Sequence, residues 1–244
     1  MSTLKADAVT TKSDNTDLTI TGGGTGVPNL ESGFKVGGTV EKLTGIAPST
    51  SGNVLTSDGT DWTSAAAAGG GAWNFLSTVT ASNSATVVIT SGITSTYGHY
   101  MLTMTDVVPA NDAVNLRMRT STDGGSTYDS GSNDYKFIAQ NRNDSATTYS
   151  ADLGDTTHIR VCDSVGNAAD EGLQGIIYFA GPSGTVINKL FRMFVWYVDS
   201  GNNAHTLDGV GMRDDVANVD AVQFYMASGN IASGVFRLYG LSNS

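Results

Sequence analysis

The chain has 244 residues, a formal net charge of −10, only 15% charged residues and 30 glycines. Because soluble proteins usually carry about 25% charged residues, this composition excludes a helical bundle and favours a turn-rich β protein. The acidic excess is spread along the chain, so no basic surface is available to bind a nucleic acid or an anionic membrane.

The first 72 residues contain few large apolar side chains. Their β-like runs are short, as in "DLTI", "GFKV", "TVEKL" and "NVLTS", and each is bounded by turn-forming residues. Asp58-Gly59 is a dipeptide typical of a two-residue hairpin turn, which would place Val54–Thr56 opposite Asp61–Thr63. The Ala- and Gly-rich residues 65–71 are typical of a spacer.

Strands this short cannot form a hydrophobic core alone, since an isolated hairpin is marginally stable at best. We therefore expect residues 1–72 to be an extended, Gly-rich segment with short hairpins that is ordered by neighbouring molecules. Such a segment would serve for anchoring and oligomerisation. Its candidate contacts with other copies are Val54, Leu55 and Trp62.

Residues 73–244 differ from the first part because they contain about ten runs of alternating apolar and polar residues. Most runs are rich in β-branched or aromatic residues, and Gly, Asn, Asp or Ser separates them. This number of short strands in one domain predicts an all-β fold, an antiparallel β-sandwich of the jelly-roll type. The runs lie at residues 84–91, 97–105, 114–120, 134–140, 157–162, 173–181, 189–198, 206–212, 219–226 and 234–241.

The run at residues 189–198, "KLFRMFVWYV", is apolar on both faces of the expected strand, and only Arg192 interrupts it. One face would pack in the core, whereas the other would meet a covering loop, a crowded neighbouring strand or another subunit. One face carries Leu190, Phe194, Trp196 and Val198. We predict that a neighbouring subunit contacts the other face, which carries Phe191, Met193, Val195 and Tyr197.

The sequence offers no catalytic, metal-binding or cofactor-binding constellation. The motif "STDGGSTY" (121–128) resembles the Asp-box turn of sialidases, in which Asp123 would have a structural role. His99, His158 and His205 lack metal-ligand spacing, and "GGGTGVPN" (22–29) lacks the Lys of a phosphate-binding loop. We expect no cofactor, no metal and no enzymatic activity.

Cys162 is the only cysteine, so no disulfide can form within the chain. We expect a small buried side chain at this position. No apolar run approaches the roughly 20 residues that span a bilayer, and the amino terminus lacks the apolar stretch of a secretory signal. The sequence therefore predicts neither membrane insertion nor export by the standard secretory route.

Three segments resemble tailed-bacteriophage virion proteins, especially tail fibres. They are "MSTLKADAVTTKSDNTDLTITGGGTG" (1–26), "PSTSGNVLTSDGTDWTS" (48–64) and the final "SGNIASGVFRLYGL" (228–241). The resemblance implies a component of the virion exterior, commonly a homotrimer. Its amino terminus would bind other virion proteins, and its carboxy-terminal β domain would face outward.

The expected function is that of a short trimeric tail fibre whose residues 73–244 contact a host-surface receptor, a glycan. Loop residues suited to sugar hydroxyls are Tyr128, Asp129, Asn133 and Tyr149. The alternative is a protein that decorates the capsid or forms a head fibre. A third class, a carbohydrate-active enzyme, would need carboxylates clustered in a cleft.

Overall fold

The computed structural model describes residues 53–57, 62–66, 72–144 and 148–242. The chain divides into two units, Met1–Ala68 and Gly69–Ser244. The described part of the first unit consists of two antiparallel strands, β1 (Asn53–Ser57) and β2 (Trp62–Ala66).

The hairpin of the first unit is confirmed with a different register, and the predicted turn residues Asp58 and Gly59 lie outside the described structure. Thr56 pairs with Thr63 and Ser57 pairs with Trp62, so residues 58–61 connect the strands. The observed register differs from the predicted one by two residues, which leaves each side chain on its expected face. Of the three predicted contact residues, Val54 and Leu55 are exposed, and the side chain of Trp62 lies outside the described structure.

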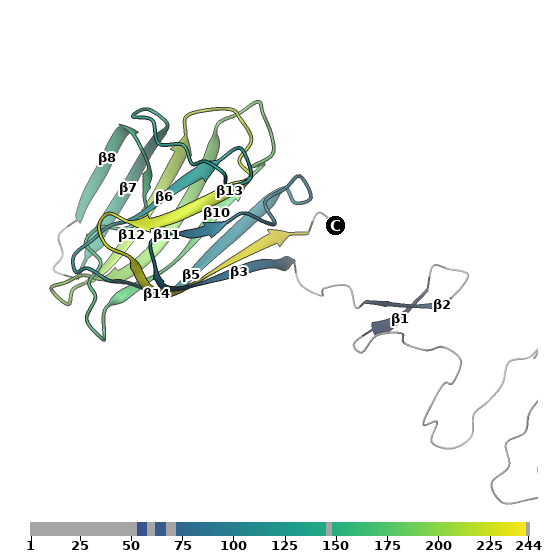
Figure 1. Cartoon of the computed structure of the whole chain (residues 1–244), viewed down its shortest axis with the longest axis horizontal. Coiled ribbons are helices and arrows are strands. Elements are labelled where there is room, and N and C mark those ends of the chain that lie inside the picture. Colours follow the sequence, from purple (N-terminus) through teal and green to yellow (C-terminus); the bar gives the residue numbers. More distant parts are fainter. Residues whose placement is uncertain (1–52, 58–61, 67–71, 145–147, 243–244) are drawn as a thin grey trace, which may run out of the picture. The chain divides into compact units, whose positions relative to one another are not determined.

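The described part of the second unit contains twelve strands arranged in two antiparallel sheets (Figure 1). The larger sheet has the order β3-β14-β5-β10-β11-β12-β7-β8, and the smaller sheet has the order β4-β13-β6-β9. The strands are β3 (Trp73–Ser84), β4 (Val87–Ile89), β5 (His99–Pro109), β6 (Leu116–Ser121), β7 (Tyr135–Asn143), β8 (Thr148–Thr156), β9 (Ile159–Arg160), β10 (Gly172–Ala180), β11 (Lys189–Val198), β12 (Ala204–Arg213), β13 (Ala221–Met226) and β14 (Ile231–Leu241). No described segment is a helix that could span a bilayer.

The strand order is that of a jelly roll with two additional hairpins. If β7, β8, β11 and β12 are set aside, the sheets are β3-β14-β5-β10 and β4-β13-β6-β9. The first strand then pairs with the last, and the second with the last but one, as in the double Greek key of a jelly roll. The additional strands β11-β12-β7-β8 extend the larger sheet. The predicted all-β sandwich is therefore confirmed.

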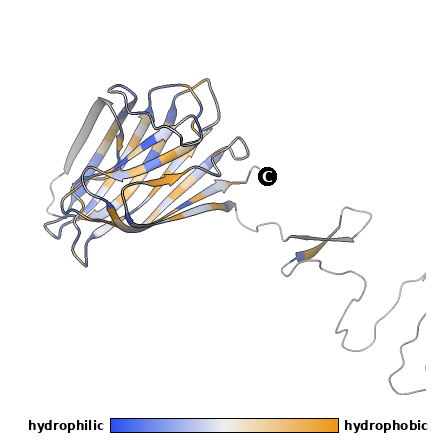
Figure 2. Ribbon diagram, viewed as in Figure 1, coloured by the Kyte–Doolittle hydropathy of each residue, from blue (hydrophilic) through white to orange (hydrophobic). Residues whose placement is uncertain are grey.

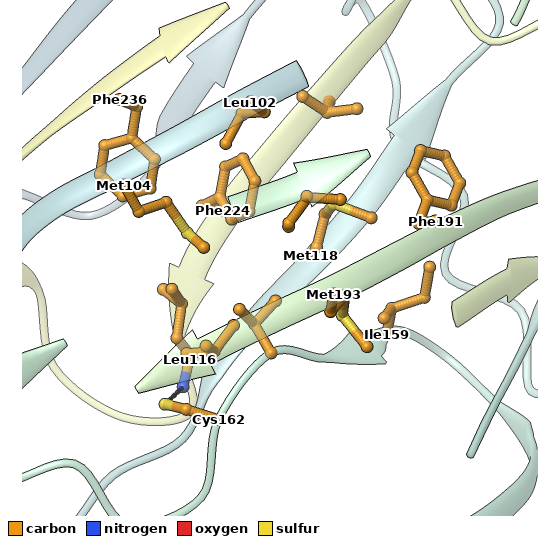
Figure 3. Close-up of a cluster of buried hydrophobic side chains, with 14 of the residues drawn as sticks. Leu102, Met104, Leu116, Met118, Ile159, Cys162, Phe191, Met193, Phe224 and Phe236 are labelled. Carbon is orange, nitrogen blue, oxygen red and sulfur yellow. Dashed lines mark hydrogen bonds between the residues drawn. The ribbon is translucent and has the colours of Figure 1, made fainter. Parts of the chain in front are cut away.

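The hydrophobic core lies between the two sheets (Figure 3). Phe224 of the smaller sheet packs against Phe236 of the larger sheet, with ring centroids 5.1 Å apart. Cys162 is buried, as predicted, and its Sγ atom accepts a hydrogen bond from the backbone N–H of Leu116 at 3.2 Å. Hydrophobic positions recur along the strands of both sheets (Figure 2).

In strand β11, the face that we predicted to contact another subunit is the face that packs in the core. Its odd-numbered positions face the core, and its even-numbered positions face away from the smaller sheet. The prediction of a subunit contact is therefore wrong for four buried residues, namely Phe191, Met193, Val195 and Tyr197. The outer face, which no other sheet of this unit covers, exposes Leu190, Phe194 and Trp196.

Candidate ligand-binding cleft

A cleft of about 720 Å³ lies at one end of the larger sheet. It forms where β5, β7 and β11 end and where β10 and β12 begin, together with the loop that precedes β10. Its lining combines one exposed indole with carboxylates, amides and hydroxyls. The side chains most relevant to binding are Asp106, Arg142, Asn143, Asp144, Asp170, Glu171, Gln174, Trp196, His205 and Thr206.

Trp196 is the aromatic centre of the cleft. It lies on the outer face of β11, and 44% of its surface is exposed. The strand register places Gln174 on one side of it and Thr206 on the other, with Arg142 next in the same row. A flat aromatic ring is thus bordered across the sheet by an amide, a hydroxyl and a guanidinium group.

A β-bulge brings Asp106 into the cleft lining. Between Met104 and Val107, strand β5 has one residue more than the facing segment of β10. Asp106 lies in this segment with a φ of 51°, a conformation uncommon for residues other than glycine. Bulges of this kind redirect side chains and are frequent beside functional sites, which supports a functional role for the cleft.

The loop before β10 contributes two acidic groups, Asp170 and Glu171. The Oε2 atom of Glu171 accepts a hydrogen bond from the backbone N–H of Ala168 at 2.7 Å, and the Glu171 N–H donates to the Ala168 carbonyl at 3.0 Å. These bonds fix the loop at the cleft. Since Asp106 and Asp144 also line it, the cleft contains more acidic than basic side chains.

A buried polar network lies at the inner side of the cleft, centred on His205. Its Nδ1 atom is 3.1 Å from Oδ1 of Asn141, and its Nε2 atom is 2.9 Å from Oδ2 of Asp199. Both partner atoms are acceptor oxygens, and the tautomer of the ring decides which nitrogen donates. The ring also stacks on Tyr197, with centroids 4.8 Å apart.

Asn141 continues this network toward the smaller sheet. Its amide donates to the hydroxyl of Tyr197 at 2.7 Å and to Oδ2 of Asp163 at 3.1 Å. Asp163 in turn forms an ion pair with Arg160 at 2.7 Å. Because buried polar groups that are hydrogen-bonded hold their neighbours in one geometry, the network supports the end of β11 that carries Trp196.

Burial alone would raise the pKa of Asp199, but hydrogen bonds to its carboxylate outweigh this effect. The backbone and side chain of Asn203, the ring of His205 and the backbone N–H of Gly201 all contribute. The pKa of Asp199 is thereby lowered to about 2. The carboxylate next to His205 is therefore ionised at neutral pH.

The arrangement is suited to binding a polar ligand that has one flat apolar face. An indole can contact such a face, while carboxylates and amides accept hydrogen bonds from hydroxyl groups. The acidic lining is unsuited to anionic ligands. In the part of the chain that the structure describes, no group of three or more His, Cys, Asp or Glu residues could hold a metal ion.

Those predicted receptor residues whose side chains the structure describes do not line the cleft. Tyr128 is half-buried, and the carboxylate of Asp129 forms an ion pair with the buried Arg213. Burial raises the pKa of Asp129, and the charge of Arg213 opposes this. Asn133 is exposed, whereas the side chain of Tyr149 in β8 lies outside the described structure.

The turn at residues 121–128 has the structural role predicted for it. Asp123 accepts hydrogen bonds from the backbone N–H of Thr127 at 2.9 Å, from the Thr127 hydroxyl at 2.7 Å and from the Ser121 hydroxyl at 2.7 Å. These bonds lower the pKa of Asp123 to about 2. Gly124 and Gly125 both adopt a positive φ, as the turn requires.

Sequence reasoning missed the cleft, although one signal was present. The alternation in "KLFRMFVWYV" placed Trp196 on one face of a strand, but both faces were apolar, so the sequence did not identify the outer one. The remaining cleft residues come from segments far apart in the chain.

No protein-family model matches the sequence, and comparisons with curated proteins and with solved structures found no match.

Proposed function

We propose that this chain is a structural component of a bacteriophage virion, a short trimeric fibre anchored by residues 1–72. Its jelly-roll domain would contact a host-surface glycan through the cleft at Trp196. The observation that carries the receptor role is the exposed indole bordered by Gln174, Thr206 and Arg142. The resemblance of three segments to phage fibre proteins supports the virion assignment.

The fold is compatible with this role, because jelly rolls occur in both viral capsid and lectin domains. In the proposed complex, the apolar face of one pyranose ring stacks on Trp196. Its hydroxyl groups hydrogen-bond to the Gln174 amide, the Thr206 hydroxyl and the acidic lining. The excess of carboxylates favours a neutral sugar over an acidic one.

Glycan binding is tested by applying the purified full chain to an array of bacterial surface polysaccharides and measuring affinity for the best ligand. We expect Trp196→Ala to lower the affinity at least about tenfold, the equivalent of ~1.4 kcal/mol. The matched control is Ile138→Ala, which removes another exposed apolar side chain of the same sheet outside the cleft. Absence of binding to any glycan, or equal effects of the two changes, would refute the receptor role.

The position of the protein in the particle is tested by immunogold labelling of phages that carry the gene. Clusters at the tail would support the fibre, whereas many copies over the head would indicate capsid decoration. Particles without label would contradict the virion assignment altogether.

Because four carboxylates line the cleft, the same preparations are also assayed for release of reducing sugar. A fibre that only binds releases none. Release that is lost when Asp106 or Glu171 is replaced by its amide would instead identify a carbohydrate-active enzyme.

A further inference from the structure

We propose that the jelly-roll domains of neighbouring copies contact each other directly. The exposed loop residues Val186 and Ile187 of one copy would insert into an apolar hollow on the outer sheet face of the next. This inference deepens the proposed trimer by naming a second contact that does not involve residues 1–72.

The hollow has a volume of about 410 Å³ and lies on the outer face of the larger sheet. Trp73 and Tyr178 form part of its wall, with ring centroids 6.0 Å apart. Leu190, which is 54% exposed, borders it together with Ala180 and Leu241. An apolar depression of this kind on a protein surface marks a site of interaction.

The side chains that fit this hollow lie in the loop between β10 and β11. Val186 is 84% exposed and Ile187 is 71% exposed, the highest values among the large hydrophobic residues in the described ranges. Neither residue lines the hollow of its own copy. The loop nevertheless joins the two strands, β10 and β11, that contribute Tyr178 and Leu190 to the hollow.

A buried lysine holds this loop in place. The Nζ atom of Lys189, which is almost fully buried, donates to the carbonyl of Ile187 at 2.7 Å and to that of Val216 at 3.1 Å. The N–H of Val219 donates to the Pro182 carbonyl at 2.8 Å at the start of the loop. The fixed backbone thus exposes two aliphatic side chains to water, which is unfavourable. Packing against a partner would remove this exposure.

Charge does not oppose a second copy as that partner. The chain has a net charge of −10, so two copies repel unless they meet through a surface without carboxylates. None of the residues lining the hollow is acidic. Its one strongly basic group, Arg192, already forms an ion pair with Asp208 and donates to the Gly209 carbonyl at 3.1 Å. The contact would therefore bury no unpaired charge.

The geometry of the contact agrees with a ring. Because the loop of one copy would enter the hollow of the next, the contact can be repeated head-to-tail, whereas a reciprocal exchange would pair two copies about a two-fold axis. Head-to-tail contacts either close into a ring or continue as a filament. Three copies joined through residues 1–72 would close such a ring.

The contact is tested by site-specific cross-linking in the full chain. A tagged chain carrying Ile187→Cys is co-expressed with an untagged chain carrying Ala180→Cys, and the purified complex is oxidised. The native Cys162 is buried and does not interfere. We expect a disulfide between tagged and untagged chains, and loss of this product when Leu190→Glu is added to the untagged chain. The control pairs Ile138→Cys with Ala180→Cys, because Ile138 is exposed on the same sheet outside the hollow.

Sedimentation and glycan binding of the wild-type chain separate the possible failures. A trimer whose cross-linking does not exceed that of the control pair refutes the proposed contact and leaves the trimer intact. A monomer at micromolar concentration refutes both. Cross-linking between chains that bind no glycan supports the contact and refutes the receptor role alone.

Discussion

The hydroxyl of Tyr135 accepts a hydrogen bond from the backbone N–H of Thr120 at 2.8 Å and thereby joins the two sheets. Tyr135 belongs to β7 of the larger sheet, and Thr120 belongs to β6 of the smaller one. Both residues are fully buried. Since β7 belongs to one of the two hairpins added to the jelly roll, this bond fixes the added strands to the original framework.

Replacement of Tyr135 by Phe should therefore destabilise the domain. The change leaves the buried N–H of Thr120 without this acceptor, which costs roughly 1–3 kcal/mol of the free energy of unfolding. Urea unfolding monitored by fluorescence measures the loss. The matched control is Tyr225→Phe, because the buried hydroxyl of Tyr225 has no hydrogen-bond partner in the described structure. A similar loss for both variants would contradict the role of the bond.

Gly211 is required because strand β9 packs closely against it. A Cβ atom at this position would lie 2.5 Å from Cγ2 of Ile159 and 2.7 Å from its Cδ1. We expect Gly211→Ala to lower the free energy of unfolding by about 1–3 kcal/mol through overpacking. In an Ile159→Ala background, which removes the obstructing atoms, the same change should cost less. Equal costs in the two backgrounds would exclude overpacking as the cause.

His158 should make the stability of the domain depend on pH. Burial lowers the pKa of His158 to about 4, and the charges of Arg117, Arg119 and Arg160 add to this effect. The unfolded chain, with a pKa near 6.5, thus binds a proton at a higher pH than the folded one. The contribution of His158 to stability is full above about pH 6.5 and is lost as the pH falls toward 4.

Urea midpoints measured between pH 4.5 and 7.5 test this expectation for His158. The wild-type midpoint should fall more steeply on acidification than that of His158→Gln. The exposed Asn133 supplies the control, since Asn133→Gln changes no ionisable group and should retain the wild-type slope. If the pH profile of His158→Gln ran parallel to that of the wild type, the His158 ring would have the same pKa in the folded and unfolded states, which would contradict the prediction.

Asp199→Asn should destabilise the domain at neutral pH, because hydrogen bonds to a charged carboxylate become weaker bonds to an amide. The expected loss is roughly 1–2 kcal/mol after solvent screening. The folded pKa of about 2 lies below the ordinary value, so the wild-type advantage is present above about pH 4 and is lost as the pH approaches 2. Unfolding curves of the wild type and of Asp199→Asn at pH 2, 4 and 7 measure this difference in stability. The control is Asp170→Asn, because Asp170 is exposed.

Cys162 should be unreactive in the folded protein. Burial raises the pKa of its thiol to about 12, so the reactive thiolate is absent at neutral pH. A chromogenic disulfide reagent should label one thiol per chain in urea and essentially none in native buffer. Rapid labelling under native conditions would mean that the loop after β9 opens readily.

The sequence was sufficient to predict the fold class because alternation is a local property. All ten predicted runs overlap observed strands. Strand β8 was missed because "TYSADLGDT" contains almost no apolar alternation and is recognised only through its pairing with β7. Strand β3 was missed because only Ala81 of its residues is buried, so "WNFLSTVTASNS" lacks the large apolar alternation of a core strand.

The candidate site could not be predicted for a different reason. Asp106, Glu171 and Trp196 lie far apart in sequence and become neighbours only through the order of the strands in the larger sheet. That order depends on long-range pairing, which leaves no local signature. The bulge at Asp106 could not be predicted either, because it consists of one extra residue in β5 relative to the strand with which β5 pairs.

The position of β14 between β3 and β5 has a consequence for biosynthesis. The last strand of this domain separates two strands that precede it in the chain, so β3 has no partner in the larger sheet, and β5 has only β10, until β14 has been synthesised. The incomplete domain therefore exposes unpaired strand edges, and its larger sheet is completed only after β14 has been synthesised. Until then those edges are open to pairing with other chains, which is a route to aggregation.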